Sequence, residues 1–307
     1  MNGRIKMSLL VTGSIGIDTV TTPYGVSENC AGGSAVYFSM AASYFSPVRF
    51  IGVIGADCPF NMAEIFTGRD VDLRGLEVRE LSKTFRWKGS YHDTMNEAIT
   101  DNVELNVLAE APPEVPEVFT DSQFVFLANT NPALQHKLLD QISNPTFVTA
   151  DTMNCWIQGY LNELKALLKR IDCIIINEDE AKMLAGQRNL IKAAELIKQM
   201  GPRVTIIKRG DAGSLMFEAN GDMFSLPAFP TADVKDPTGA GDSFAGALMG
   251  YLANAGNADF NTLKTALGYG TVAASFTIEN FSLLGISSAT RADIDKRFET
   301  LKKLTQF

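Results

Sequence analysis

The sequence has little of what a zinc site or a disulfide framework needs. Its 307 residues include only two histidines and four cysteines. The cysteines share no metal-ligand spacing and lie in mostly apolar stretches, so we expect them to be buried, reduced thiols. They are Cys30, Cys58, Cys155 and Cys173. His92 and His136 lie in polar stretches, and we assign neither a role.

The sequence also lacks the features of a membrane protein or a nucleic-acid-binding protein. Its longest apolar runs are only strand-length, no cluster of Lys and Arg stands out, and the net charge is −8. Because phosphate neutralisation dominates nucleic-acid binding, we predict neither nucleic acid nor a membrane as a partner. Residues 1–16 contain no signal-peptide cleavage pattern, so we expect a cytoplasmic enzyme.

The pattern along the chain is typical of an α/β protein. Hydrophobic residues make up 46% of the sequence, enough for a sizeable core. Strands are predicted at 7–12, 48–54, 123–128, 146–150, 172–177 and 203–208, with a hairpin at 213–226. Helices are predicted at 132–142, 158–169, 180–185, 190–200, 263–278 and 291–304. Repeated βα units predict a parallel sheet with helices on both faces and ligands at the carboxyl ends of its strands.

The most distinctive stretch covers residues 234–251, VKDPTGAGDSFAGALMGY. A short polar loop runs into Gly239, Ala240 and Gly241, and a helical pattern of small and apolar residues follows at once. The N–H groups of a glycine-rich turn at a helix start have no intrahelical partner, and the helix dipole adds about half a positive charge there. The sequence therefore predicts an anion-binding site at this turn.

Asp242 lies inside the predicted anion site. A carboxylate there repels a resting phosphate, but it suits a base that takes a proton while negative charge develops beside it. Phosphoryl transfer needs such a pairing of an anion cradle with a base. The alternative is that Asp242 only caps the helix, where Asp is common.

Residues 236–244, DPTGAGDSF, resemble the C-terminal signature of the ribokinase-like (PfkB-type) carbohydrate and nucleoside kinases. The resemblance implies that the Gly239–Gly241 backbone forms the anion hole and that Asp242 is the catalytic base. It also implies the fold: one three-layer α/β/α domain over residues 1–307, with a mostly parallel sheet and a small β-strand lid.

Residues 13–18, Gly-Ser-Ile-Gly-Ile-Asp, follow the first predicted strand. Their G-x-x-G spacing does not match the G-x-G-x-x-G fingerprint of dinucleotide-binding folds. The resemblance gives Asp18 the role of binding substrate sugar hydroxyls, since a carboxylate can accept hydrogen bonds from two vicinal hydroxyls. The alternative is a turn aspartate.

Further acceptor-binding candidates follow along the chain. The pair Gly32-Gly33 before a predicted helix is similar to the family's N-terminal signature, where it lets the backbone approach the substrate. Tyr37 stands where the family often has Asn, so we expect a differently shaped pocket. Asp57 follows the second predicted strand in a Gly-x-Asp pattern and is a further candidate.

The nucleotide side is predicted from two more motifs. Asn177 and Glu180 match the family's N-x-x-E motif, which organises the Mg²⁺ of Mg-ATP largely through water. Acidic residues at a helix start also complement its dipole, and this alternative stays open. Gly210 and Gly213 match the family's nucleotide-binding turn.

Four nearby residues complete the predicted nucleotide side. Lys208 or Arg209 is expected to reach a nucleotide phosphate, with exposure to solvent as the alternative. Thr238 belongs to the predicted nucleotide-binding loop. Relatives often hold a monovalent cation such as K⁺ near this loop, and Asp236 and Thr238 lie where it is expected.

The resemblance also implies a lid, with strands from about 17–29 and 84–108, that closes over the substrate and excludes water. Alternating aromatic and polar residues from 85 to 91 support strands there, although an ordinary edge hairpin is the alternative. An exposed aromatic lid face would suit a homodimer. Tyr37 and the lid aromatics favour a nucleoside slightly, because they could stack a base.

The predicted function is therefore ATP-dependent phosphorylation of a primary hydroxyl on a sugar or ribonucleoside, with Mg²⁺ as cofactor. A non-catalytic sugar- or nucleotide-binding protein of the same fold is one alternative, although it would not need Asp242 in the anion site. A nicotinamide-dependent oxidoreductase is another, although its glycine fingerprint is missing.

Overall fold

The computed structural model describes residues 7–92 and 95–306. Within them, nine strands form one large sheet, and four strands form a second, small sheet. In spatial order the large sheet contains β13 (Met223–Leu226), β12 (Ser214–Glu218), β11 (Val204–Lys208), β10 (Cys173–Asn177), β9 (Phe147–Ala150), β8 (Phe124–Leu127), β1 (Leu9–Thr12), β4 (Val48–Gly55) and β5 (Val71–Arg79). Strands β11 to β5 pair in parallel, whereas β12 and β13 are antiparallel additions at one edge.

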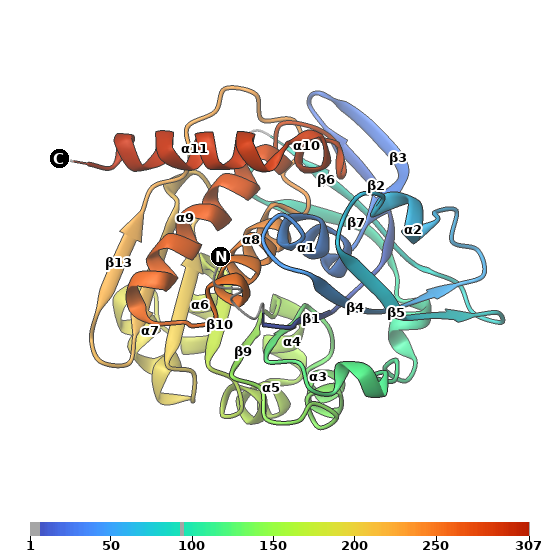
Figure 1. The fold of residues 1–307 in the computed structure, drawn as a ribbon, viewed down its shortest axis with the longest axis horizontal. Helices are drawn as coiled ribbons and strands as arrows, with labels where there is room; N and C mark the ends of the chain where they lie inside the picture. Colours follow the sequence, from blue (N-terminus) through green and yellow to red (C-terminus); the bar gives the residue numbers. More distant parts are fainter. Residues whose placement is uncertain (1–6, 93–94, 307) are drawn as a thin grey trace, which may run out of the picture.

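Two helix layers cover the large sheet (Figure 1). One layer contains α1 (Ser34–Ala42), α2 (Met62–Ile65), α8 (Ala240–Ala255), α9 (Phe260–Thr277), α10 (Leu284–Ser288) and α11 (Arg291–Leu304). The other contains α3 (Pro132–Leu139), α4 (Asn154–Gly159), α5 (Leu161–Leu168), α6 (Glu178–Ala185) and α7 (Leu190–Gln199). Successive residues of β1 face opposite layers, because strand side chains alternate: Leu9 and Val11 pack with the first, Leu10 with the second. The predicted three-layer α/β/α class is confirmed.

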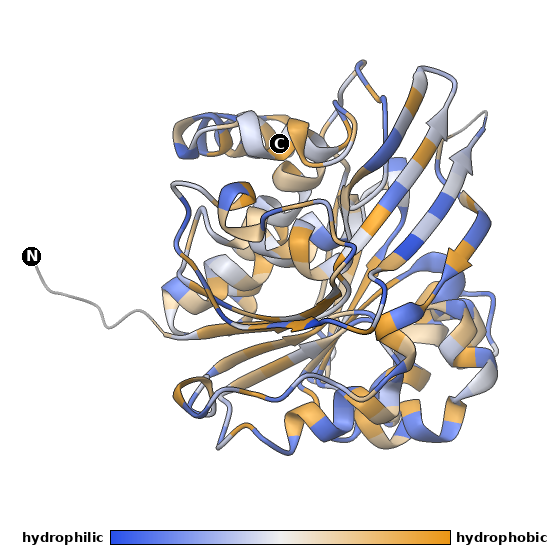
Figure 2. Ribbon diagram, turned by 90° about the vertical axis from the view of Figure 1, so that its right-hand side faces the viewer, coloured by the Kyte–Doolittle hydropathy of each residue, from blue (hydrophilic) through white to orange (hydrophobic). Residues whose placement is uncertain are grey.

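The small sheet has the order β3 (Gly25–Gly32), β2 (Gly16–Thr22), β6 (Phe85–Tyr91), β7 (Ala98–Glu104). Figure 2 shows it projecting away from the hydrophobic strands of the large sheet. Every residue of β7 is exposed. Strands β6 and β7 lie within the predicted lid segment 84–108, of which residues 93 and 94 lie outside the described residues. Strands β2 and β3 cover most of the predicted segment 17–29 and extend from residue 16 to residue 32.

Three details differ from the predictions. Strand β5 is not among the predicted strands, because Asp72, Arg74 and other charged residues interrupt its apolar pattern. The single helix predicted at 158–169 is two helices, α4 and α5, because the backbone of Tyr160 leaves helical geometry. Cys155 was predicted to be buried, and this was wrong: it lies exposed on the short helix α4, and Cys30 and Cys58 are only partly buried.

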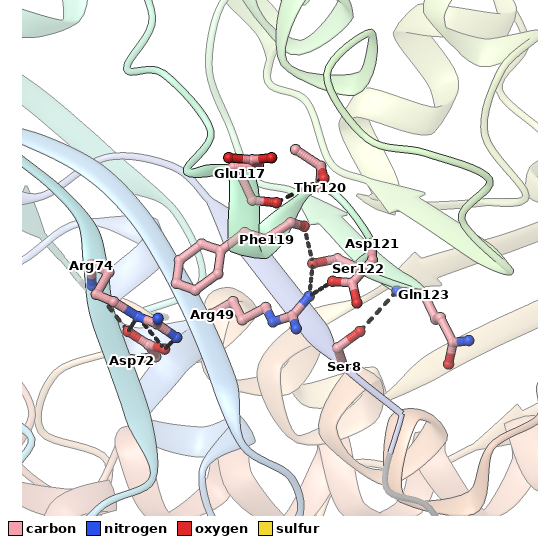
Figure 3. A network of polar contacts seen from close by, with 10 residues as sticks. All are labelled: Ser8, Arg49, Asp72, Arg74, Glu117, Phe119, Thr120, Asp121, Ser122 and Gln123. Carbon is pink, nitrogen blue, oxygen red and sulfur yellow. Dashed lines mark hydrogen bonds and ion pairs between the residues drawn. The ribbon is translucent and has the colours of Figure 1, made fainter.

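A polar network marks the amino edge of the large sheet, opposite the predicted ligand edge (Figure 3). The guanidinium carbons of Arg49 and Arg74 each lie 5.5 Å from the ring centroid of the buried Phe119. Arg49 also donates hydrogen bonds to Asp121 and Ser122. Phe119 belongs to the core, and the two guanidinium groups cover its ring at this edge.

No helix within 7–92 and 95–306 is long and apolar enough to cross a bilayer.

Candidate active site

The predicted anion-binding turn begins helix α8. Gly239 precedes the helix with a φ of 74°, a left-handed conformation that favours glycine. A methyl group at this position would overlap the ring of Tyr37. The N–H of Ala240 donates to the Pro237 carbonyl, 3.1 Å away, so this amide is already used. The N–H groups of Gly241 and Asp242 follow in the first helical turn, where helix geometry supplies no partner.

Lys208 lies next to this helix start. It ends strand β11, and its Nζ lies 2.6 Å from the point where a Cβ on Gly241 would stand. Arg209, the other cation considered for a phosphate contact, instead forms an ion pair with Glu178 at 3.2 Å. The structure therefore adds one ammonium group to the amides of the anion-binding turn.

Asp242 lies in the first turn of α8, as predicted. Burial raises the pKa of its carboxyl group to about 6, while the Lys208 ammonium acts in the opposite direction. A carboxyl group with this pKa is mostly ionised at neutral pH and still holds a proton more readily than an ordinary aspartate. These are the properties that a general base needs.

Asp18 is nearly fully buried, with 4% of its surface exposed, and it lies within β2 and not in a loop. Its Oδ1 is buried without a hydrogen-bond partner among the described residues. Burial, together with the carboxylates of Asp236 and Asp242, raises the pKa of Asp18 to about 7. A methyl group at Gly32 would overlap the Asp18 carboxylate, so glycine at this position makes room for it.

The other predicted acceptor residues, Gly33, Tyr37 and Asp57, have three different surroundings. Gly33 directly precedes helix α1 as its N-cap, and its backbone N–H stabilises the Asp18 carboxylate. Tyr37 is only 2% exposed and packs against Gly239, which leaves no face of its ring open for a stacked base. Asp57 accepts a hydrogen bond from the Thr84 N–H and pairs with Arg86, so it is tied to the start of β6.

The Asn177-x-x-Glu180 motif forms a reciprocal capping box at the start of α6. The Asn177 side chain accepts from the Glu180 N–H, and the Glu180 side chain accepts from the Asn177 N–H, both at 2.8 Å. Burial raises the pKa of Glu180, and Lys208 opposes this shift. The two residues therefore stabilise the start of α6 through a capping box, whereas the sequence had suggested a complement to the helix dipole as the alternative.

A cavity of about 510 Å³ lies beside the anion-binding turn. At one end it is lined by Lys208, Gly210, Gly213, Ala240 and Gly241. Its other walls come from the segment after β13, from α8, from α9 and its cap, and from the β6–β7 connection. They include Phe229, Pro230, Thr231, Val234, Phe244, Thr271, Ala274, Ser275, Ile278, Met95 and Asn96. The predicted nucleotide-binding turn, from Gly210 to Gly213, therefore shares one cavity with the anion-binding turn.

The loop before α8 is held by the buried Asp236. Its Oδ1 accepts from the Thr238 N–H at 2.9 Å, and its Oδ2 accepts from the Ser282 N–H at 3.1 Å. The Thr238 hydroxyl donates to the Tyr91 hydroxyl at 3.3 Å. The small sheet therefore contacts the anion-binding loop directly.

Asp151 is a site residue that was not predicted. It follows β9 at the carboxyl edge, is 8% exposed, and has an Oδ1 without a hydrogen-bond partner among the described residues. Burial and the Asp242 carboxylate raise its pKa well above the usual value for aspartate. The available signal was its position directly after a short apolar strand, which places an aspartate at the ligand edge.

The raised pKa of Asp18 predicts that its carboxylate destabilises the protein without ligand at high pH. The folded protein holds a proton here that the unfolded chain releases between about pH 4 and pH 7, so the free energy of unfolding falls as pH rises through this range. We expect Asp18→Asn to be more stable than the unmodified protein at pH 8, by on the order of 2–4 kcal/mol, and to differ little at pH 4.5.

Urea unfolding at the two pH values measures this difference. Asp259→Asn is the matched control. The Asp259 carboxylate accepts from the Thr262 N–H and has a lowered pKa, so its loss should destabilise the protein at pH 8. An Asp18→Asn variant that is less stable than the unmodified protein at pH 8 would contradict the burial argument.

Comparison with known proteins gives one family and several relatives. The family model described as pfkB family carbohydrate kinase matches residues 19–288. The chain is 28% identical over 255 residues to the cytidine kinase of Thermococcus kodakarensis, covering 80% of this chain and 88% of that protein.

Solved structures with the same fold include several with a bound ligand. The nucleoside kinase of Burkholderia thailandensis in complex with inosine has a TM-score of 0.76 at 20% identity, covering 95% of this chain and 97% of that one. The ribokinase of Cryptococcus neoformans in complex with ADP has a TM-score of 0.76 at 21% identity, covering 96% and 100%. At these identities the structural likeness establishes the fold.

Proposed function

Since this chain belongs to the PfkB family of carbohydrate kinases and is an ATP-dependent kinase with an alcohol group as acceptor, we propose that its acceptor is the primary hydroxyl of a nucleoside. The observation that carries the chemistry is the placement of Asp242, with a pKa near 6, in the first turn of α8 beside Lys208. The match to a cytidine kinase over most of both chains supports a nucleoside over a free sugar.

In the proposed reaction Asp18 accepts hydrogen bonds from sugar hydroxyls and so orients the acceptor. Asp242 takes the proton of the primary hydroxyl, whose oxygen attacks the γ-phosphorus as ADP leaves. The N–H groups of Gly241 and Asp242 and the ammonium of Lys208 hold the negative charge that builds up on the transferred group. The base and the charge-stabilising groups therefore lie together at the start of α8 and the adjacent end of β11.

The two ends of the cavity beside this turn differ in chemistry, and this difference favours one orientation of bound ATP. Its cationic, amide-rich end at Lys208 and Gly241 suits phosphates. The opposite wall combines apolar groups with hydroxyls, from Phe229, Thr271, Ala274 and Ser275, and suits a purine ring. We therefore place the γ-phosphate at the helix start and the adenine against α9.

The charges around the phosphate end also fit Mg²⁺. Asp151, Glu180 and Asp242 bring three carboxyl groups toward one ammonium, Lys208, and the buried Asp151 Oδ1 has no partner among the described residues. Mg²⁺ keeps several of its waters when it is bound, so a site with few protein ligands suits an ion held mainly by water and phosphate oxygens. Bound Mg²⁺ would neutralise phosphate charge, with Glu180 and Asn177 as its nearest predicted supports, through water.

Three further parts of the proposal have separate tests. A monovalent cation such as K⁺ near Asp236 and Thr238 would rely on backbone carbonyls, because both Asp236 oxygens already accept backbone N–H groups. Comparing activity in KCl with activity in tetramethylammonium chloride tests whether the cation is needed.

A homodimer through the small sheet is supported by the exposed strand β7, in which Ile99 and Val103 are about half exposed. Light scattering tests this dimer by measuring the molar mass in solution. A cytoplasmic location is proposed from the kinase chemistry, which uses ATP, and cell fractionation tests it.

The acceptor class is tested by ADP release from Mg-ATP with a panel of nucleosides and free sugars. We expect kcat/KM for the best nucleoside to exceed that for ribose by at least about 100-fold, since a site that binds a base loses those contacts with the sugar alone. Activity should disappear in excess chelator. A free sugar as the best acceptor would overturn the nucleoside assignment, and nucleotide binding without turnover on any acceptor would favour a binding protein.

A further inference from the structure

The base side of the nucleotide cavity is built partly from a segment without regular secondary structure. Residues 227–239 connect β13 to α8, and Phe229, Pro230 and Thr231 of this segment line the cavity. A wall of this kind needs contacts from outside itself to stay in place. The structure provides them through two charged residues, neither of which lines the cavity.

Glu279 is the first of these residues and directly follows α9 and its cap Ile278. Its Oε1 accepts a hydrogen bond from the Thr231 hydroxyl at 2.9 Å. The backbone carbonyl of Ile278 accepts from the Lys235 N–H at 2.7 Å, which fixes the same segment further along. The end of α9 therefore anchors the segment at two points.

Arg297 of α11 is the second residue. Its two terminal nitrogens donate to the two Glu279 carboxylate oxygens at 3.0 and 3.2 Å, and one of them also donates to the Ser275 hydroxyl at 3.0 Å. Its guanidinium carbon lies 3.5 Å from the Phe276 ring centroid and 5.1 Å from that of Phe229. The Arg297 side chain is 19% exposed and that of Glu279 is 23% exposed. The ion pair, the stacking on the rings and this low exposure together restrict the position of the Arg297 guanidinium.

We propose that the Arg297–Glu279 pair is a positioning device for the base of the bound nucleotide. It links the C-terminal helix to Phe229, Thr231 and Ser275, which line the cavity, without entering the cavity itself. The pair therefore sets affinity for ATP and ADP and has no part in binding the acceptor. This inference rests on the proposed nucleotide site.

The same helix offers a matched control. Arg291 also stacks on aromatic rings, at 4.4 Å from the Phe45 centroid, and also pairs with a carboxylate, that of Asp295. Its partners, including the Tyr44 carbonyl, are absent from the residues that line the cavity. Arg291→Ala therefore removes a comparable anchor of α11 without touching the nucleotide wall.

The test measures ADP binding by calorimetry in the absence of acceptor, together with KM for ATP and for the acceptor. Arg297→Ala is expected to weaken ADP binding and raise KM for ATP by about tenfold, with the acceptor KM unchanged, because the wall loses its guanidinium contacts. Arg297→Lys should recover part of the loss. Arg291→Ala should bind ADP as the unmodified protein does.

Thr231→Val provides a milder variant, because it removes one hydrogen bond of the wall and leaves α11 untouched. It is expected to weaken ADP binding by about threefold even if Arg297→Ala fails to fold. ADP affinity unchanged in Arg297→Ala or Thr231→Val would overturn the inference, as would an equal rise in the acceptor KM. If the unmodified protein bound no ADP, the nucleotide site itself would be wrong.

Discussion

Asp242→Asn is expected to lower kcat by about 10³-fold while the protein stays folded. The amide has nearly the same shape as the carboxylate and leaves the helix start intact, but it cannot take the proton of the acceptor hydroxyl. ADP affinity should be kept or should rise, because the variant removes a negative charge beside the phosphates. The measurement is the rate of ADP release at saturating Mg-ATP and acceptor, with ADP binding followed by calorimetry.

Asp259→Asn separates catalysis from helix capping. Asp259 caps α9 by accepting from the Thr262 N–H at 2.8 Å, and it is absent from the residues that line the nucleotide cavity. We expect this variant to lose some stability and to keep its kcat. If Asp242→Asn kept more than about a tenth of the unmodified kcat, Asp242 would be a cap and not the base.

Gly239→Ala is expected to produce the second large effect, a fall in kcat of at least about 100-fold. A left-handed alanine costs about 1–2 kcal/mol by itself, and its methyl group would also overlap the Tyr37 ring. The turn must shift to relieve the overlap, which moves the Gly241 and Asp242 amides away from the transferred group. Steady-state kinetics and a urea unfolding curve measure the two consequences separately.

Gly256→Ala is the matched control for this substitution. Gly256 ends the same helix with a φ of 72°, close to the 74° of Gly239, and its nearest neighbour would be Met7 Cγ at 3.7 Å. This variant therefore carries the backbone cost without the overlap. Equal kcat values in the two variants would mean that the turn at Gly239 has no special part in catalysis.

The sequence allowed the anion-binding turn and the sheet to be predicted because both depend on local patterns. Gly239 to Asp242 are contiguous, and the strands from 123 onward are short apolar runs between helical segments. The N-x-x-E motif was visible for the same reason, since a capping box and a metal-supporting pair have the same spacing. Local spacing alone does not distinguish these two roles, and the structure contains the capping box.

The residues that sequence reasoning missed depend on contacts between distant segments. Asp151 follows a short apolar strand, but its surroundings depend on folding, which brings it close to Asp242 and buries it. In the sequence Arg297 is one of several cations in a predicted surface helix. Its partner Glu279 lies 18 residues away, so local spacing does not indicate the pair. Both cases depend on burial and on pairing between segments that are distant in the sequence.

The most direct test of phosphoryl transfer is ³¹P NMR of the unmodified protein with Mg-ATP and cytidine. The mechanism predicts that the γ-phosphate signal is replaced by that of a phosphomonoester coupled to the two protons on the primary carbon, with one ADP formed per ester. No ester signal, with ATP either intact or hydrolysed to inorganic phosphate across the nucleoside and sugar panel, would contradict the assignment of Asp242 and the α8 turn as a transfer site.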